Sequence, residues 1–156
     1  MYDITVRKAV KSDAGGILTI TREAFGKYAE DLGVDVRLDA LGETEADIIR
    51  DIENNTVFVG FMDGQMTGSV RYKLLDAEAA YFYRFGVAPA AQKYGVGTRL
   101  IRAVIDDCYA KGIKRIELHT ASKMAPLIRF YYKNGFYIHS TNDDKGYIRA
   151  RLIKEL

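Results

Sequence analysis

Residues 81–113 have the sequence YFYRFGVAPAAQKYGVGTRLIRAVIDDCYAKGI, and they decide the fold of the chain. The first seven, Tyr81–Val87, are mostly aromatic or β-branched, which predicts a largely buried strand. Pro89 ends that strand, because proline has no N–H to donate to a neighbouring strand. After the loop 92–97, apolar residues recur at the spacing of a helix that ends at Gly112. The apolar face of this helix comprises Leu100, Ile101, Val104, Ile105 and Cys108.

The loop between this strand and this helix has the form of a phosphate-binding site. The first amides of a helix have no partner inside the helix, and the helix dipole adds positive charge there. Gly95 and Gly97 lack a Cβ atom, so an anion can approach their backbone, and Thr98 can add a hydroxyl. On shape alone, a tight turn without a ligand is an equally good interpretation. The loop has neither the third glycine of a dinucleotide-binding fingerprint nor the Gly-Lys-Ser/Thr of a P-loop.

Two motifs in the chain resemble those of the GCN5-related N-acetyltransferase (GNAT) family. Val87-x-Pro89, followed by Gln92-x-x-Gly95-x-Gly97, resembles the loop that holds the pyrophosphate of coenzyme A in that family. Further on, the segment FYYKNGF at 130–136 resembles the family's Phe-Tyr-x-x-x-Gly-Phe segment. The two motifs occur in the family's order and at about its spacing, which makes the pair far more specific than either motif alone.

The order of predicted elements is also that of the GNAT family. Strands are predicted at residues 4–10, 56–62, 66–75, 81–87, 115–120, 136–141 and 146–153. Helices are predicted from Ser12 or Asp13 to Gly33, at 43–53, from the loop to Gly112 and at 124–134, with an irregular link at 34–42. The helix at 43–53 is expected to turn Ala46, Ile48, Ile49 and Ile52 inward.

The resemblance implies an α/β (α+β) fold of the GNAT type, with a mixed central sheet of about seven strands flanked by about four helices. It implies a single GNAT N-acetyltransferase domain over residues 1–156. It also implies that the strand before the loop and the strand after its helix run parallel and separate at one end. The gap between them would admit the pantetheine arm of coenzyme A.

The composition restricts the class of protein. The chain has 156 residues, 48% of them hydrophobic, and is long enough to form its own core. No apolar run approaches the roughly 20 residues of a membrane span, and the first residues predict a strand and not a signal peptide. A cytoplasmic location without a membrane partner is therefore expected. The single cysteine excludes an internal disulfide, and without a Cys/His cluster no metal site is expected.

The charges are unevenly distributed, although the net charge is only +2. Residues 28–53 include nine acidic and two basic residues, whereas 93–133 include nine basic and three acidic ones. The basic segment suits a polyanionic cofactor such as coenzyme A, and the acidic segment suits a cationic acceptor. Solvated helix faces explain the acidic segment equally well. A nucleic-acid partner is not expected, because the basic segment lacks a recognisable motif of interleaved aromatic residues.

The resemblance implies an N-acetyltransferase that uses acetyl-CoA as co-substrate. The acetyl group would pass directly, in a ternary complex, to a primary amine of a small-molecule or peptidic acceptor. A non-catalytic acyl-CoA-binding module of the same fold is the alternative, and a homodimer is left open. The amide near Val87 would polarise the thioester carbonyl. The implied cofactor-binding residues are Phe85, Gly86, Val87, Gln92, Lys93, Tyr94, Gly95, Val96, Gly97, Thr98 and Tyr131.

The catalytic residues are less fully implied. Tyr131 matches the family tyrosine that protonates the departing sulfur, and a phenol with its usual pKa is protonated at neutral pH. Many family members carry a glutamate as base on the strand that here has Tyr81 and Tyr83, so these two tyrosines are candidates for ordering a water. Glu78, Glu117 and His119 are other candidates for the base. Met124 departs from the family, which often has an asparagine there in contact with the cofactor.

Overall fold

The computed structural model describes residues 2–33 and 38–156, so residues 34–37 of the predicted link lie outside the described part. The strands are β1 (Ile4–Lys8), β2 (Thr56–Met62), β3 (Gln65–Leu74), β4 (Ala79–Val87), β5 (Arg115–Ala121), β6 (Tyr137–Asn142) and β7 (Arg149–Glu155). The helices are α1 (Ala14–Leu32), α2 (Glu45–Asn54), α3 (Val96–Ala110) and α4 (Ala125–Lys133). Short 3-10 turns lie at Lys11–Asp13, Asp39–Gly42 and Pro89–Ala91.

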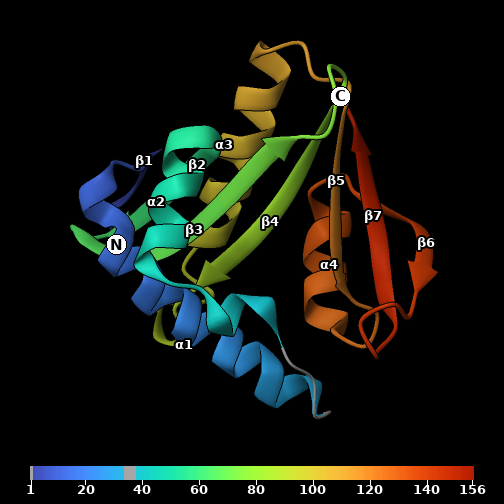
Figure 1. The fold of residues 1–156 in the computed structure, drawn as a ribbon, viewed down its shortest axis with the longest axis horizontal. Coiled ribbons are helices and arrows are strands. Elements are labelled where there is room, and N and C mark those ends of the chain that lie inside the picture. Colours follow the sequence, from blue (N-terminus) through green and yellow to red (C-terminus); the bar gives the residue numbers. More distant parts are fainter. Residues whose placement is uncertain (1, 34–37) are drawn as a thin grey trace.

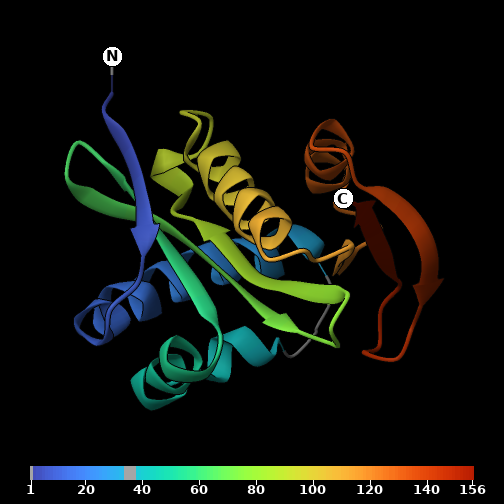
Figure 2. The ribbon, with the colours of Figure 1, turned by 90° about the horizontal axis from the view of Figure 1, so that it is seen from above.

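The strands form one mixed sheet in the order β1-β2-β3-β4-β5-β7-β6. Neighbouring strands pair antiparallel except β4 and β5, which run parallel on either side of α3 in the chain. Helices α1 and α2 cover one face of the sheet, and α3 and α4 cover the other (Figures 1 and 2). The predicted seven-stranded mixed sheet with four helices is confirmed.

Local sequence signals explain most element boundaries. Asp63 and Gly64 both have positive φ, 52° and 81°, as the two-residue turn between β2 and β3 requires. Thr44 caps α2, because its hydroxyl accepts from the Asp47 N–H while the Asp47 carboxylate accepts from the Thr44 N–H. The predicted apolar face of α3 is confirmed as core, and burial raises the pKa of the Cys108 thiol to about 11.

Several predicted details were wrong, among them the start of the last strand, which lies at Arg149 and not at residue 146. The first strand ends at Lys8 and not at residue 10, because the Asp13 carboxylate accepts from the Val10 N–H and closes a 3-10 turn there. Helix α2 begins at Glu45 and not at Glu43, whose carboxylate is drawn into the interior. Ala46, predicted to face inward on that helix, is exposed.

The strands β4 and β5 separate after a short paired stretch (Figure 1). Only Ala79–Tyr81 pair with Arg115–Glu117, so the rest of β4 has an open edge toward β5. The register between β3 and β4 also shifts opposite Arg84, which has a φ of +52°. Such a bulge bends a strand and increases its twist. The implied separation of these two strands is confirmed.

Helix α1 closes one side of this opening. Gly86 permits the close approach, since a Cβ atom there would lie 2.8 Å from the Cβ of Ala24. About one turn further along α1, the hydroxyl of Tyr28 accepts a hydrogen bond from the Ala121 N–H at 2.8 Å. The helix therefore bridges β4 and β5 where they no longer pair. Within residues 2–33 and 38–156, no helix is long and apolar enough to cross a membrane.

Candidate active site

Two cavities meet where β4 and β5 separate. The first, of about 170 Å³, lies between α1, the turn before α2, the middle of β4 and the strands β5 and β7. The second, of about 690 Å³, lies between α1, the end of β4, the loop before α3 and the start of α4. Phe25, Tyr28, Phe85 and Leu127 line both cavities. A group bound in one cavity therefore lies next to a group bound in the other.

Most of the predicted cofactor-binding residues gather at the second cavity. It is lined by Phe85, Gly86, Val87, Gln92, Lys93, Gly95, Gly97 and Thr98. Two others have side chains elsewhere. Tyr94 is exposed and packs edge-on against Tyr2, with the ring centroids 4.9 Å apart, and Val96 lies in the core. Met124, the departure from the family, lines this cavity with an apolar side chain.

The backbone of Val87 faces the open edge of β4. The Ala88 N–H donates to the Thr67 carbonyl of β3 at 2.8 Å, and successive amides of a strand point to opposite edges. The Val87 carbonyl on the open edge accepts from the Gln92 side-chain amide at 3.3 Å. The Val87 N–H is thus directed into the space between β4 and β5, where an extended ligand could pair with it.

The glycines of the loop have two different roles. Gly95 precedes α3 with a φ of +99°, a left-handed conformation that favours glycine. At Gly97 a Cβ atom would lie 3.1 Å from the Phe85 ring, so this glycine lets the first turn of α3 pack against β4. The unpaired amides of that turn are thereby held beside the second cavity.

Tyr131 lines the first cavity and not the second, so its expected contact is with the reacting end of a ligand. The side chain is only 4% exposed and packs edge-on against Phe82 and Phe136. Its hydroxyl makes no hydrogen bond to any residue in the described ranges. Burial raises the pKa of this phenol well above its ordinary value, and Tyr28 and Tyr81 raise it further. Tyr131 is therefore protonated at neutral pH and can donate a proton.

Tyr81 and His119 form a hydrogen-bonded pair in the same cavity. The Tyr81 hydroxyl lies 2.8 Å from His119 Nδ1, which joins β4 to β5 just beyond their last backbone pair. Burial lowers the pKa of His119, and the positive charges of Arg149 and Arg151 lower it further. Burial raises the pKa of Tyr81, against the effect of Arg149 and Arg84. At neutral pH the pair is therefore uncharged, with a ring nitrogen able to accept a proton.

Tyr83 is not available for the role predicted for it. Its hydroxyl donates to Asp51 at 2.9 Å and accepts from the Asn55 side-chain amide at 3.1 Å. Burial and the Asp51 carboxylate raise the pKa of this phenol far above its ordinary value. The hydroxyl is thus already bonded to Asp51 and Asn55, although Tyr83 also lines the first cavity.

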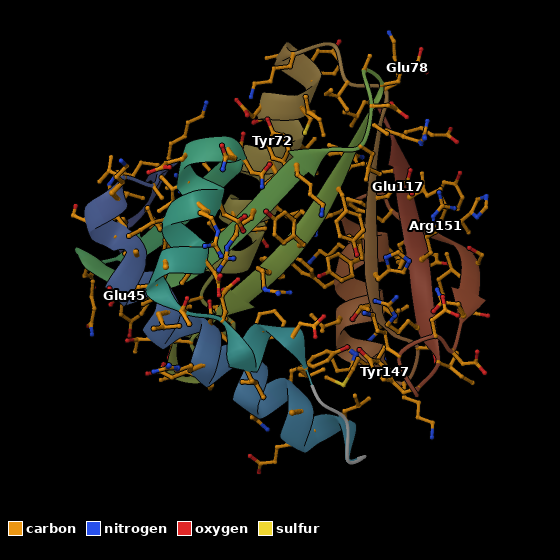
Figure 3. The ribbon with its side chains drawn as sticks, viewed as in Figure 1. Glu45, Tyr72, Glu78, Glu117, Tyr147 and Arg151 are labelled. Atoms are coloured by element: carbon orange, nitrogen blue, oxygen red, sulfur yellow. The ribbon has the colours of Figure 1, made fainter. Side chains whose placement is uncertain are left out.

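Two other candidate bases are also removed from the site. Glu78 lies in the turn where β4 and β5 begin, far from Tyr147 at the first cavity (Figure 3). Glu117 points to β7 (Figure 3). Its carboxylate accepts hydrogen bonds from Arg151 of β7 at 2.5 Å and from Arg115 of its own strand at 2.9 Å. Burial alone would raise the pKa of Glu117, but these two arginines outweigh it and lower the pKa. Of the candidate residues, Tyr81, Tyr83 and His119 line the cavity, and the Tyr83 hydroxyl is the one already bonded to Asp51 and Asn55.

Three residues of the site were missed by the sequence analysis. Arg84 is the one charged residue in the aromatic stretch of β4, which was the available signal. Tyr28 follows the apolar spacing of α1, which is the pattern of a core residue. Arg149, at the start of β7, carries no local signal, because only the pairing of β7 with β5 brings it to the cavity. Among the described residues, no three His, Cys, Asp or Glu side chains gather closely enough to hold a metal ion.

A parallel strand pair that separates beside a glycine-rich helix N-terminus, with a buried phenol in the adjoining cavity, is the arrangement of an acyltransferase type of fold. Comparison with known proteins agrees with this class. The chain matches the sequence profile of the acetyltransferase (GNAT) family over residues 19–136. The chain therefore belongs to the acetyltransferase (GNAT) family.

Individual proteins that resemble the chain do so over part of their length or at low sequence identity. The mycothiol acetyltransferase of Beutenbergia cavernae is 34% identical over 74 residues, which is 47% of this chain but only 25% of that protein. The PaiA N-acetyltransferase of Thermoplasma acidophilum, solved with coenzyme A, has a TM-score of 0.82 at 19% identity, covering 99% of both chains. A GNAT family acetyltransferase of Elizabethkingia anophelis, solved with acetyl-CoA, has a TM-score of 0.71 at 16% identity, covering 98% of both chains.

Proposed function

We propose that this protein transfers the acetyl group of acetyl-CoA directly to a primary amine. The observation that carries the proposal is the junction of the two cavities at the open edge of β4. The second cavity, with the loop before α3, suits the pyrophosphate and pantetheine of coenzyme A, and the first suits the amine. Solved relatives of the same fold that hold coenzyme A or acetyl-CoA support this assignment.

The groups around the two cavities suit the three parts of the reaction, which are polarisation of the thioester carbonyl, protonation of the leaving thiolate and removal of a proton from the amine. The Val87 N–H is placed to polarise the thioester carbonyl while the amine nitrogen attacks its carbon. The carbon–sulfur bond then breaks, and Tyr131 gives its proton to the leaving thiolate. The proton lost by the amine passes to His119, directly or through the Tyr81 hydroxyl. After release of the amide and coenzyme A, that proton returns through solvent to Tyr131.

Binding of acetyl-CoA is expected to stabilise the folded chain. A ligand that binds only the folded state adds about 2.7 kcal/mol to the free energy of unfolding at a hundredfold excess over its Kd. Thermal unfolding with acetyl-CoA, coenzyme A and NADH checks this, and only the first two should raise the midpoint. A midpoint that does not move with saturating acetyl-CoA contradicts both the transferase and a non-catalytic acyl-CoA-binding module. Release of coenzyme A on addition of an amine separates these two functions.

The pH dependence of turnover tests His119 as the base. Protonated His119 cannot accept a proton, so kcat at saturating substrates should fall on the acid side. Because burial and the nearby arginines lower its pKa from 6.5, the midpoint of this fall should lie below pH 6.5. Glu117 and Asp144 oppose the shift only weakly, and Tyr81 is uncharged in this range.

Replacing the histidine should remove that acid limb. We expect His119→Gln to lower kcat at neutral pH about 100-fold, within the usual effect of a general base. Acetyl-CoA should still raise the unfolding midpoint of this variant. The other histidine, His139, lies exposed on β6 beside Arg151, so His139→Gln should leave both kcat and the pH profile unchanged. An unaltered acid limb in His119→Gln would rule out this assignment.

A further inference from the structure

The first cavity is positively charged, which is the opposite of what the acidic segment at 28–53 had suggested. Arg84, Lys145 and Arg149 line it, and Asp39 is the one carboxylate among its lining residues. Asp39 already lies 3.8 Å from Lys145 at the exposed rim. His119 is uncharged at neutral pH for the reasons given above. The described lining therefore carries a net positive charge beside the proposed proton acceptor.

The other carboxylates of the acidic segment are directed elsewhere. Glu43 and Asp51 are bound by Arg71 in the interior, at 2.6 Å and 3.0 Å. Asp47 pairs with Arg50 on the outer face of α2. Of the acidic residues of this segment that the structure describes, only Asp39 lines the first cavity. The prediction that this segment would favour a cationic acceptor therefore has no support in the arrangement of the cavity.

Arg149 is a cation of the first cavity with an unsatisfied donor. Its Nε is buried and makes no hydrogen bond to any of the described residues. Leaving a buried charged donor unsatisfied costs free energy. The guanidinium lines the same cavity as Tyr81 and His119, and its charge acts to lower the pKa of both. A ligand anion on Arg149 would thus lie near the place where the amine must react.

Arg84 adds a second positive charge to the same cavity. Its φ of +52° is rare for a residue with a side chain, and strained residues of this kind concentrate at functional sites. Its Nε is 3.4 Å from Glu43 Oε2, and its side chain remains 26% exposed. Glu43 in turn is fixed by the buried Arg71. This chain of contacts holds Arg84 in the cavity with part of its guanidinium free for a ligand.

We propose that the acceptor is a small amine that also carries an oxyanion, a carboxylate or a phosphate, bound by Arg149 and Arg84. A guanidinium suits either anion because its planar donors match two of its oxygens. Arg149 lines the same cavity as Tyr81 and His119 and pairs with Ala121, two residues from His119 along β5, so the amine and the anion should be near each other, as in an amino acid. This inference rests on the proposed acetyl transfer and specifies its acceptor.

Matched pairs of amines test the inference on the unaltered protein. The carboxylate arm compares L-amino acids and β-alanine with their carboxamides, and the phosphate arm compares O-phosphoethanolamine with ethanolamine. Spermidine represents cationic acceptors. With saturating acetyl-CoA, kcat/KM should be at least about tenfold higher for the anionic member of the preferred pair, as expected for a hydrogen bond to a charged group. The arm with the larger ratio identifies the anion.

A variant locates the anion site. Compared at a pH where His119 is uncharged in both proteins, Arg149→Gln should lower kcat/KM for the anionic amine about tenfold to a hundredfold more than for its neutral partner. Arg102→Gln, at an exposed arginine of α3 that lines neither cavity, should change neither value. The acetyl-CoA shift of the unfolding midpoint shows whether each variant is folded.

The outcomes separate this inference from the proposed function. Preference for spermidine or for the neutral members would overturn the inference while acetyl transfer stands. The same holds if acetyl-CoA binds but no anionic amine is acetylated. Loss of the anion preference in Arg149→Gln, but not in Arg102→Gln, supports the inference. If acetyl-CoA itself fails to shift the midpoint, the proposed function is what fails.

Discussion

Replacing Tyr131 with phenylalanine should lower turnover about 100-fold or more while acetyl-CoA binds as before. A general acid typically contributes 10²–10⁴-fold to a rate, and Tyr131 is the buried, protonated phenol at the junction of the two cavities. The loss should be similar across the accessible pH range, because the raised pKa keeps Tyr131 protonated throughout it. Steady-state release of coenzyme A across a range of pH, together with the acetyl-CoA shift of the unfolding midpoint, measures both effects.

The neighbouring tyrosine provides a matched control. Tyr132 is 49% exposed, and its hydroxyl accepts from the Ile138 N–H outside both cavities. Tyr132→Phe should therefore retain full turnover. The folded state of Tyr131→Phe should be no less stable than the unaltered protein, because the hydroxyl it removes has no partner among the described residues. Full turnover in Tyr131→Phe would show that the leaving sulfur is protonated by another group.

Replacing Arg71 with methionine should destabilise the fold by about 3–5 kcal/mol, the usual effect of removing one partner from a buried ion pair. The Arg71 side chain is 1% exposed and donates to both oxygens of Glu43, at 2.6 Å and 2.7 Å, and to Asp51 at 3.0 Å. Without Arg71, Glu43 and Asp51 lose these ion pairs, and only the longer contact from Arg84 to Glu43 remains. Urea unfolding at neutral pH measures the loss.

Two further variants separate the charge effect from the loss of volume. Neutralising the partners in the triple variant Arg71→Met, Glu43→Gln, Asp51→Asn should restore much of the stability, because no uncompensated charge is then buried. Arg50→Met removes an exposed arginine paired with Asp47, so it should cost less than about 1 kcal/mol. A single Arg71→Met variant as stable as Arg50→Met would contradict the role given to this cluster.

The buried cluster also links stability to the site. Arg71 holds Glu43, and Glu43 holds Arg84 at the first cavity. Asp51 of the same cluster accepts from Tyr83 and so fixes the middle of β4 against α2. Burying this much charge is costly unless every partner is present. The cluster therefore holds Arg84 and Tyr83, which both line the first cavity.

The sequence by itself determined the order and type of the elements and the place of the cofactor loop. These depend on local physics: the period of apolar residues in α3, the lack of an N–H in Pro89, and the positive φ that Gly95 adopts. Tyr131 was also predicted as the proton donor, through the resemblance of the segment at 130–136, and it lines the first cavity. Such features need only residues that are near one another in the chain.

Only the tertiary structure decided which side chains surround the acceptor. Tyr81 and His119 are 38 residues apart, and their hydrogen bond requires the parallel pairing of β4 with β5. Tyr83, two residues from Tyr81, is instead taken up by Asp51 of α2. Two carboxylates of the acidic segment, Glu43 and Asp51, form ion pairs with Arg71. Arg149 lies at the cavity because β7 pairs with β5. Local patterns do not encode these partnerships, because charge compensation and burial are set by residues that meet only when the sheet has formed.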